Sequence, residues 1–206
     1  MSLCSTPRAL LLAALLSIAA NSLWSAPRAI DTERSSITVR VFKSGLFSAF
    51  ADNHEISGAI ASGSVDEAAR RVELTIHAGA LKVVDLNLDA GKREEVQKRM
   101  AGAEVLDAEH YPEIRFRSLS VEPRGSGADK QEWLVKGELM LRGQTRPMAL
   151  HVIETKGRYF VTTSLKQRDF GIQPISIAGG TVKVKDEITI EFQVALMPET
   201  SKPAEQ

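Results

Sequence analysis

The chain has 206 residues, of which 43% are hydrophobic, with 26 Lys plus Arg against 26 Asp plus Glu. This length and apolar content fit one globular domain with an ordinary hydrophobic core. A formal net charge of zero provides no broad positive field for a phosphate backbone, which argues against a general nucleic-acid binder.

The first 26 residues have the pattern of a secretory signal peptide, which is removed on export. Arg8 precedes an apolar run at residues 9–20, and small residues follow it up to Ala26. Twelve helical residues rise about 18 Å, less than the roughly 30 Å hydrocarbon layer, so no stable membrane span is expected. We therefore expect a periplasmic protein that is cleaved after Ser22 or Ala26.

The only cysteine of the chain, Cys4, precedes the apolar run, whereas a lipid-modified cysteine would follow it. No lipoprotein is therefore predicted, and the mature chain would have no disulfide. The last residues, 198–206, are polar and contain two prolines, which predicts a disordered tail. The folded domain is thus expected at residues 27–197.

Apolar and polar residues alternate along eight segments after the leader, a period typical of half-buried β-strands. Turn residues such as Gly143 and Gly157 separate several of these segments. The spacing predicts a mainly β protein, an antiparallel meander that either closes into a barrel or folds into a sandwich. The segments are residues 37–42, 56–60, 72–77, 114–117, 133–141, 148–153, 159–165 and 188–196.

One segment, residues 89–100, breaks the strand pattern and predicts a single exposed helix. It is rich in helix-forming residues, and acidic side chains stand four positions before basic ones. Gly102 is expected to end the helix. Its apolar stripe, Val96 and Met100, is wide enough to dock on a barrel but too narrow for a membrane-surface helix.

Several stretches in a fixed order resemble the YceI-like family of secreted, lipocalin-like proteins. The resemblance implies an eight-stranded antiparallel barrel around a long apolar cavity, which in some members holds a polyisoprenoid chain such as a prenylated quinone tail. It also implies a periplasmic location. The stretches are residues 41–56, 105–118 (VLDAEHYPEIRFRS), 137–150 (GELMLRGQTRPMAL), 167–172 (QRDFGI) and 184–190 (VKDEITI).

One departure concerns Asp52, Asn53 and His54, where members similar to this chain commonly carry a His-Asp-His pattern. Any polar cap or metal site that the histidine pair forms in relatives is therefore in doubt here. His54, Asp52 and His110 are the best candidate metal ligands, but no two histidines have a spacing that brings them together locally. No metal site and no cofactor are predicted, and His54 is kept as a candidate ligand-binding residue.

The segment Arg168-Asp169-Phe170-Gly171-Ile172 is a candidate rim of the cavity. Arg168 would donate hydrogen bonds to the polar head of an apolar ligand, with Asp169, Phe170 and Ile172 beside it. The alternative is structural, since an arginine and an aspartate at a strand end can pair and fix a loop.

Aromatic residues give two further candidates. Phe47 and Phe50 follow the first strand and would form a lid or a cavity mouth, or else pack in the core. Tyr111 and Phe116 flank the start of another strand, where a ring with a hydroxyl would suit a quinone or lipid head, with ring packing as the alternative.

The export signal and the strand pattern favour a non-enzymatic periplasmic binding protein, and the resemblance implies a carrier that buries a polyisoprenoid or prenylated quinone. No G-x-S-x-G elbow occurs, and abundant carboxylates select no catalytic pair. One alternative is an enzyme acting on a small hydrophobic substrate in the same cavity, with His54 or Asp169 as the titrating group. Another is a stress or interaction protein whose barrel is filled. Unpaired edge strands leave a homodimer open.

Overall fold

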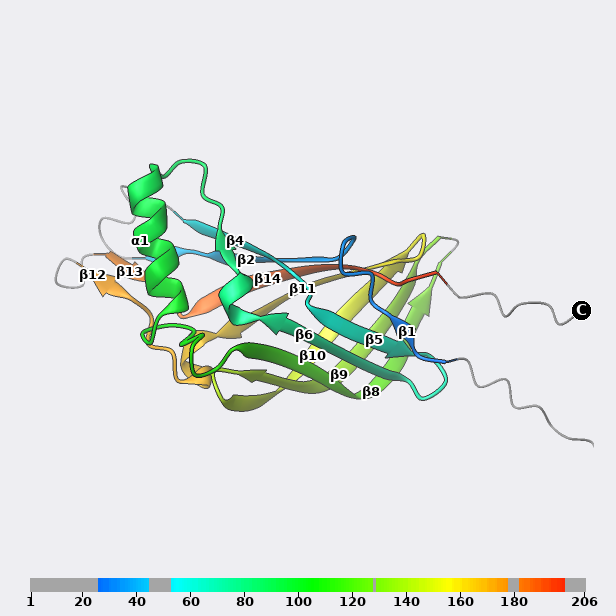
Figure 1. Ribbon diagram of the computed structural model, residues 1–206. Helices are drawn as coiled ribbons and strands as arrows, with labels where there is room; N and C mark the ends of the chain where they lie inside the picture. The colour runs from blue at the N-terminus through cyan, green and yellow to red at the C-terminus, as the bar shows by residue number, and fades with distance from the viewer. Residues whose placement is uncertain (1–25, 45–52, 128, 178–181, 199–206) are drawn as a thin grey trace, which may run out of the picture.

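The structure is a computed structural model that describes residues 26–44, 53–127, 129–177 and 182–198. Within these residues the chain is mainly β, with one α-helix (Figure 1). The large sheet contains β1 (Arg28–Ala29), β2 (Ser36–Val41), β4 (His54–Ala59), β5 (Ser62–Asp66), β6 (Arg71–His77), β7 (Lys82–Val83), β8 (Glu113–Ser126), β9 (Gln131–Leu141), β10 (Gln144–Thr155), β11 (Arg158–Lys166) and β14 (Glu187–Ala195).

All neighbouring strands of this sheet are antiparallel, in the order β1-β5-β6-β8-β9-β10-β11-β14-β2-β4-β7. Strands β8 to β11 form a meander, and tight turns at Gly143 and Gly157, both with positive φ, separate β9 from β10 and β10 from β11. A small second sheet pairs β12 (Ser176–Ile177), β13 (Val182–Val184) and β3 (Lys43–Ser44).

The large sheet curls back on itself, as Figure 1 shows. The chain leaves β4 at Ile60, which is fully buried, and continues as β5 on the other side of the curl. At the start of the chain, Ile30 donates its N–H to Gly63 and forms a β-bridge with Leu196 after β14. The segment around β1 therefore joins β5 to the end of β14, and the fold is a lipocalin-like barrel.

Helix α1 (Ala90–Ala101) covers one end of the barrel (Figure 1). Asp89 caps its start by accepting a hydrogen bond from the N–H of Lys92, and Gly102 ends it. The Gln97 side-chain amide fixes the helix to the chain around β7. Its nitrogen donates to the Leu81 carbonyl, and its oxygen accepts from the N–H of Val83. Met100 is buried, and Val96 packs against the core.

The fold confirms the predicted mainly β class and the helix. Each of the eight alternating segments lies in a strand to within one residue at its end, and the sheet contains three further short strands, β1, β5 and β7. The expected leader and the tail beyond residue 198 lie outside the described residues. Among the residues that the structure describes, no helix is long and apolar enough to cross a membrane.

Candidate ligand-binding cavity

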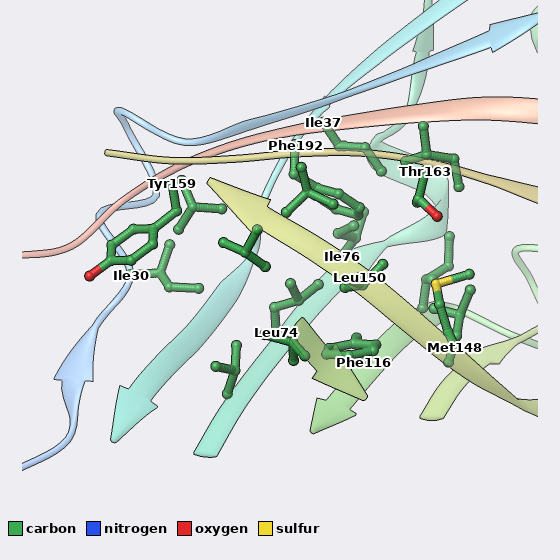
Figure 2. A pocket seen from close by; sticks show the side chains of 18 of the residues that line it. Ile30, Ile37, Leu74, Ile76, Phe116, Met148, Leu150, Tyr159, Thr163 and Phe192 are labelled. Atoms are coloured by element: carbon green, nitrogen blue, oxygen red, sulfur yellow. The ribbon is translucent and has the colours of Figure 1, made fainter. Parts of the chain in front are cut away.

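A cavity of about 730 Å³ runs inside the curled sheet. Alternation along each strand turns every second side chain inward, so branched aliphatic residues from opposite sides of the barrel face one another. Figure 2 shows this lining, with Ile37, Ile76 and Leu150 from three different strands around the same space. The size and apolar wall match those of small-molecule sites.

Few aromatic side chains line the cavity, and the ring of Phe116 packs against the sheet where a neighbouring residue has no side chain. Gly137 of β9 faces inward, and a Cβ atom added there would lie 2.6 Å from Cζ of Phe116 on the neighbouring strand β8. The missing side chain therefore gives the Phe116 ring a place against the wall. Phe192 and Trp133 also line the cavity from β14 and β9.

The end of the cavity under helix α1 is closed by buried side chains. Leu81, Met100, Leu106 and Ile172 line it there, and each is less than 9% exposed. Gln167, which is 7% exposed, adds the one buried polar side chain among the described lining residues. Its amide nitrogen donates to the Lys185 carbonyl, and no described residue bonds its side-chain oxygen.

The opposite end is polar, and we call it the mouth. Its residues come from the start of β1, the β5–β6 turn, the start of β9 and the β10–β11 turn, which the strand order places together. Several are exposed, so the cavity communicates with solvent at this end. The mouth consists of Arg28, Asp66, Glu67, Arg70, Arg71, Gln131, Glu154, Gly157 and Tyr159.

Tyr159 is the aromatic residue of the mouth, and its hydroxyl points away from the apolar group of side chains in Figure 2. Burial is the largest cause that raises the pKa of this hydroxyl, and the charges of Glu154 and Glu67 raise it further. Arg28 lowers it by a smaller effect. The phenol is therefore protonated at neutral pH and available as a hydrogen-bond donor.

Two of the predicted site residues line the cavity, Phe116 on its wall and Ile172 at its closed end. Phe170, which is 3% exposed, belongs to the hydrophobic core but does not line the cavity. Phe47 and Phe50 lie outside the described residues.

Arg168 and Asp169 lie in a short 3-10 helix (Gln167–Phe170) after β11, at the closed end rather than at the mouth. The Arg168 backbone N–H donates to Asp186, and its guanidinium lies 3.9 Å from the same carboxylate. Asp169 accepts a hydrogen bond from Arg146 through its backbone carbonyl. Arg168 therefore pairs with Asp186 and not with Asp169. These contacts fix the loop, as in the structural alternative proposed for this segment, and do not place Arg168 at the mouth.

Tyr111 is 40% exposed and does not line the cavity. A Cβ atom added at Gly143 would lie 2.6 Å from its ring carbon Cε1, so the ring covers the β9–β10 turn. His54 also lies outside the lining, and its Nδ1 is 2.6 Å from Oδ2 of Asp85. The other carboxylate oxygen of the buried Asp85 accepts from the N–H of Glu55, so Asp85 anchors the chain before helix α1 through two contacts with β4.

Potential metal ligands do not gather in the described part of the chain, where no three His, Cys, Asp or Glu side chains could hold an ion together. His110 contacts Asp107 at 2.8 Å and is exposed, and His54 contacts a single carboxylate.

Sequence reasoning missed the mouth. Tyr159 was placed in a strand but not in a site, and Arg28, Glu67 and Glu154 have no local motif. The only signal was indirect, because turns that follow alternate strands of a meander must meet at one end of the barrel. That signal identifies turns but does not identify the end that is open.

Comparisons with known proteins agree with this architecture. The family model of the YceI-like domain matches residues 29–196. A UPF0312 protein of Shewanella putrefaciens is 28% identical over 178 residues, which cover 79% of this chain and 87% of the relative.

Two solved structures share the fold. One is a polyisoprenoid binding domain from Saccharophagus degradans, with a TM-score of 0.55, 14% identity and coverage of 81% of this chain and 95% of that one. The other is BcnA of Burkholderia cenocepacia, with a TM-score of 0.53, 16% identity and coverage of 80% and 98%. With a family model matched over most of its length and this barrel, the chain belongs to the YceI-like family.

Proposed function

We propose that this protein is an exported, periplasmic carrier that binds a long apolar molecule of the polyisoprenoid or prenylated quinone type inside its barrel. The observation that carries the proposal is the open cavity of about 730 Å³ with a continuous apolar wall. The Saccharophagus degradans domain of the same fold, which is described as polyisoprenoid binding, supports the choice of ligand.

The wall explains how such a ligand would be held. Each methylene group buried from water contributes about 0.8 kcal/mol, so a prenyl chain needs few hydrogen bonds to bind tightly. Part of this gain offsets the loss of translational and conformational freedom on binding. Apolar contacts with the aliphatic wall do not depend on the orientation of the ligand, so selectivity must come from the length of the cavity and from the polar groups at its ends.

Catalysis is not part of the proposal. Between the mouth and the closed end, the polar side chain of the described lining is Thr163, a weak acid and base. His54 and Asp169, the titrating groups of the enzyme alternative, lie outside the lining. The charged groups of the cavity gather at the mouth, where solvent reaches them.

The test is extraction of the protein from its native exported fraction, followed by mass spectrometry of the organic phase. Val161 faces the cavity on β11, and the next residue, Thr162, is exposed. The variant Val161→Trp projects a bulky ring into the cavity and blocks the path of a long chain, while Thr162→Trp adds the same side chain outside. We expect a stoichiometric prenyl species in the wild type and in Thr162→Trp, and its loss from Val161→Trp.

Thermal unfolding checks that both variants fold. If Val161→Trp does not fold, Leu150→Phe places a smaller additional volume in the cavity. An empty wild-type extract, together with no uptake of added ubiquinone, would refute the carrier and favour the interaction protein.

A further inference from the structure

The two ends of the cavity differ in polarity and in exposure. The closed end is formed by buried side chains under helix α1, such as Met100 and Leu106. The mouth contains exposed charged residues, including Glu67 and Arg70. Tyr159 stands at the mouth end of β11, and seven residues of strand, about 23 Å, separate it from the closed end. An amphiphile aligned with this gradient has its tail under α1 and its head at the mouth.

We propose that the polar head of the ligand lies at the mouth, where the Tyr159 hydroxyl donates a hydrogen bond to it, and that an uncharged head is selected over an anionic one such as a diphosphate. This inference rests on the proposed function and adds to it the direction of the ligand and the class of its head.

The contacts of Tyr159 leave its hydroxyl available. The ring lines the cavity and is partly buried, and the hydroxyl makes no hydrogen bond to any residue that the structure describes. Glu154, directly opposite on β10, uses a carboxylate oxygen to accept from the N–H of Gly157. Because Tyr159 is only partly buried, water can reach its hydroxyl, and a ligand acceptor at this point would replace that water with a hydrogen bond inside the site.

The charges around this hydroxyl select against anions. Glu154, paired directly opposite on β10, and Glu67 each act on Tyr159 more strongly than Arg28 does, so acidic groups outweigh this arginine at the hydroxyl. Arg28 is itself engaged, because its guanidinium donates to the Met197 carbonyl and lies 3.6 Å from Glu67. Arg70 and Arg71, the other two arginines of the mouth, are exposed, so solvent screens their charges. A neutral oxygen acceptor avoids the repulsion that a diphosphate would meet.

The reverse direction is the competing arrangement. At the closed end, the side-chain oxygen of Gln167 accepts no hydrogen bond from the described residues, and Thr163 lies halfway along the same wall. A head placed there would need a hydroxyl or amide donor, and it would leave the apolar tail among the charges of the mouth. Burial of the tail favours the direction that we propose.

The chain provides a fluorescence probe and a matched control for the test. Trp133 lines the cavity on β9, two residues from Gln131 of the mouth. The substitution Trp24→Phe removes the second tryptophan, so that the fluorescence of the test protein comes from Trp133 alone. The chain has two tyrosines, of which Tyr159 lines the cavity and Tyr111 does not. Tyr159→Phe and Tyr111→Phe therefore remove the same hydroxyl group from inside and outside the site.

The first experiment titrates geranylgeraniol and geranylgeranyl diphosphate, which share one tail, against Trp133 fluorescence. We expect the alcohol to bind at least about tenfold more tightly, and Tyr159→Phe to weaken it about fivefold with no change in Tyr111→Phe. Glu154→Gln should strengthen binding of the diphosphate. Equal or tighter binding of the diphosphate by the wild type would overturn the selection of head charge.

The second experiment determines direction with two isomers of a long-chain alcohol, brominated next to the hydroxyl or at the far end of the tail. Bromine quenches a nearby tryptophan, so the isomer brominated next to the hydroxyl should quench Trp133 more strongly. Stronger quenching by the other isomer would place the head at the closed end and overturn the proposed direction. If neither alcohol nor diphosphate binds, the carrier function itself fails.

Discussion

The packing of Phe116 on Gly137 makes the substitution Gly137→Ala a sharp test of the cavity wall. An added Cβ would lie 2.6 Å and 2.9 Å from two carbons of the Phe116 ring, and it would also meet the backbone carbonyl oxygen of Arg117. A flexible side chain could turn aside, but a strand carbonyl paired in a sheet cannot. The strand or the ring must move, and both movements disturb the core.

The expected cost follows from this geometry. Adding a methyl group to a well-packed interior costs about 1–3 kcal/mol, and contact with the backbone places Gly137→Ala in the upper half of that range. For a domain of this size, about 2–3 kcal/mol lowers the melting temperature by about 4–12 °C. The ring, once displaced, enters the cavity, so binding of a long apolar ligand should weaken as well.

Thermal unfolding followed by circular dichroism measures the effect, and Gly125→Ala is the matched control. Gly125 lies in β8, where an added Cβ meets nothing within 4 Å and no positive φ opposes it. Its substitution should be neutral or stabilise the protein by about 0.5 kcal/mol, because glycine is unfavourable in a strand. Equal melting temperatures for Gly137→Ala and the wild type would show that Phe116 does not depend on the missing side chain.

Three further predictions concern the closed end and one surface pair. Asp85→Ala leaves the N–H of Glu55 without its buried acceptor and should cost about 1–3 kcal/mol in urea unfolding, whereas Asp85→Asn should cost less. Gln97→Ala removes both hydrogen bonds that fix helix α1 near β7, and hydrogen exchange of the helix amides should become faster while that of β9 is unchanged. The hydrogen bond and charge of Asp107 raise the pKa of His110, so their stabilising effect is present below the ordinary histidine pKa and is lost as the pH rises through the raised value. NMR titration of the His110 ring should show the raised pKa, and Asp107→Asn should remove most of the rise, because only the smaller effect of Glu109 remains.

The strands and the helix were predictable because each is long enough to show its period. The eight predicted segments carry alternating apolar residues, and the helix has a cap, a stripe and a terminal glycine. The three missed strands of the large sheet are too short or too poor in apolar residues to show a period. β1 and β7 contain two residues each, and β5 (Ser62–Asp66) carries one large apolar side chain, Val65.

The site was less predictable, since its residues are joined only by the closure of the barrel. Phe116 was a candidate because of its ring at the start of a strand and Ile172 because of its place in the segment from Arg168 to Ile172, and both line the cavity. Arg168 was assigned to a rim because a polar cluster at a strand end fits either end of a barrel. Only the packing of helix α1 over that side shows that this end is closed. Tyr159, by contrast, reads in the sequence as one more apolar position of a strand.

The same alternation that makes the cavity also limits what it can recognise. Inward positions of the long strands are aliphatic, so the wall contributes affinity that grows with the length of the buried tail and is insensitive to its chemistry. Discrimination therefore depends on the few positions where the barrel ends and polar residues follow. At the mouth these residues lie in turns or at the strand ends beside them, which accept substitution more readily than the core does. A change of ligand head among related barrels would then require changes at positions such as Tyr159 and Glu154, while the wall stays the same.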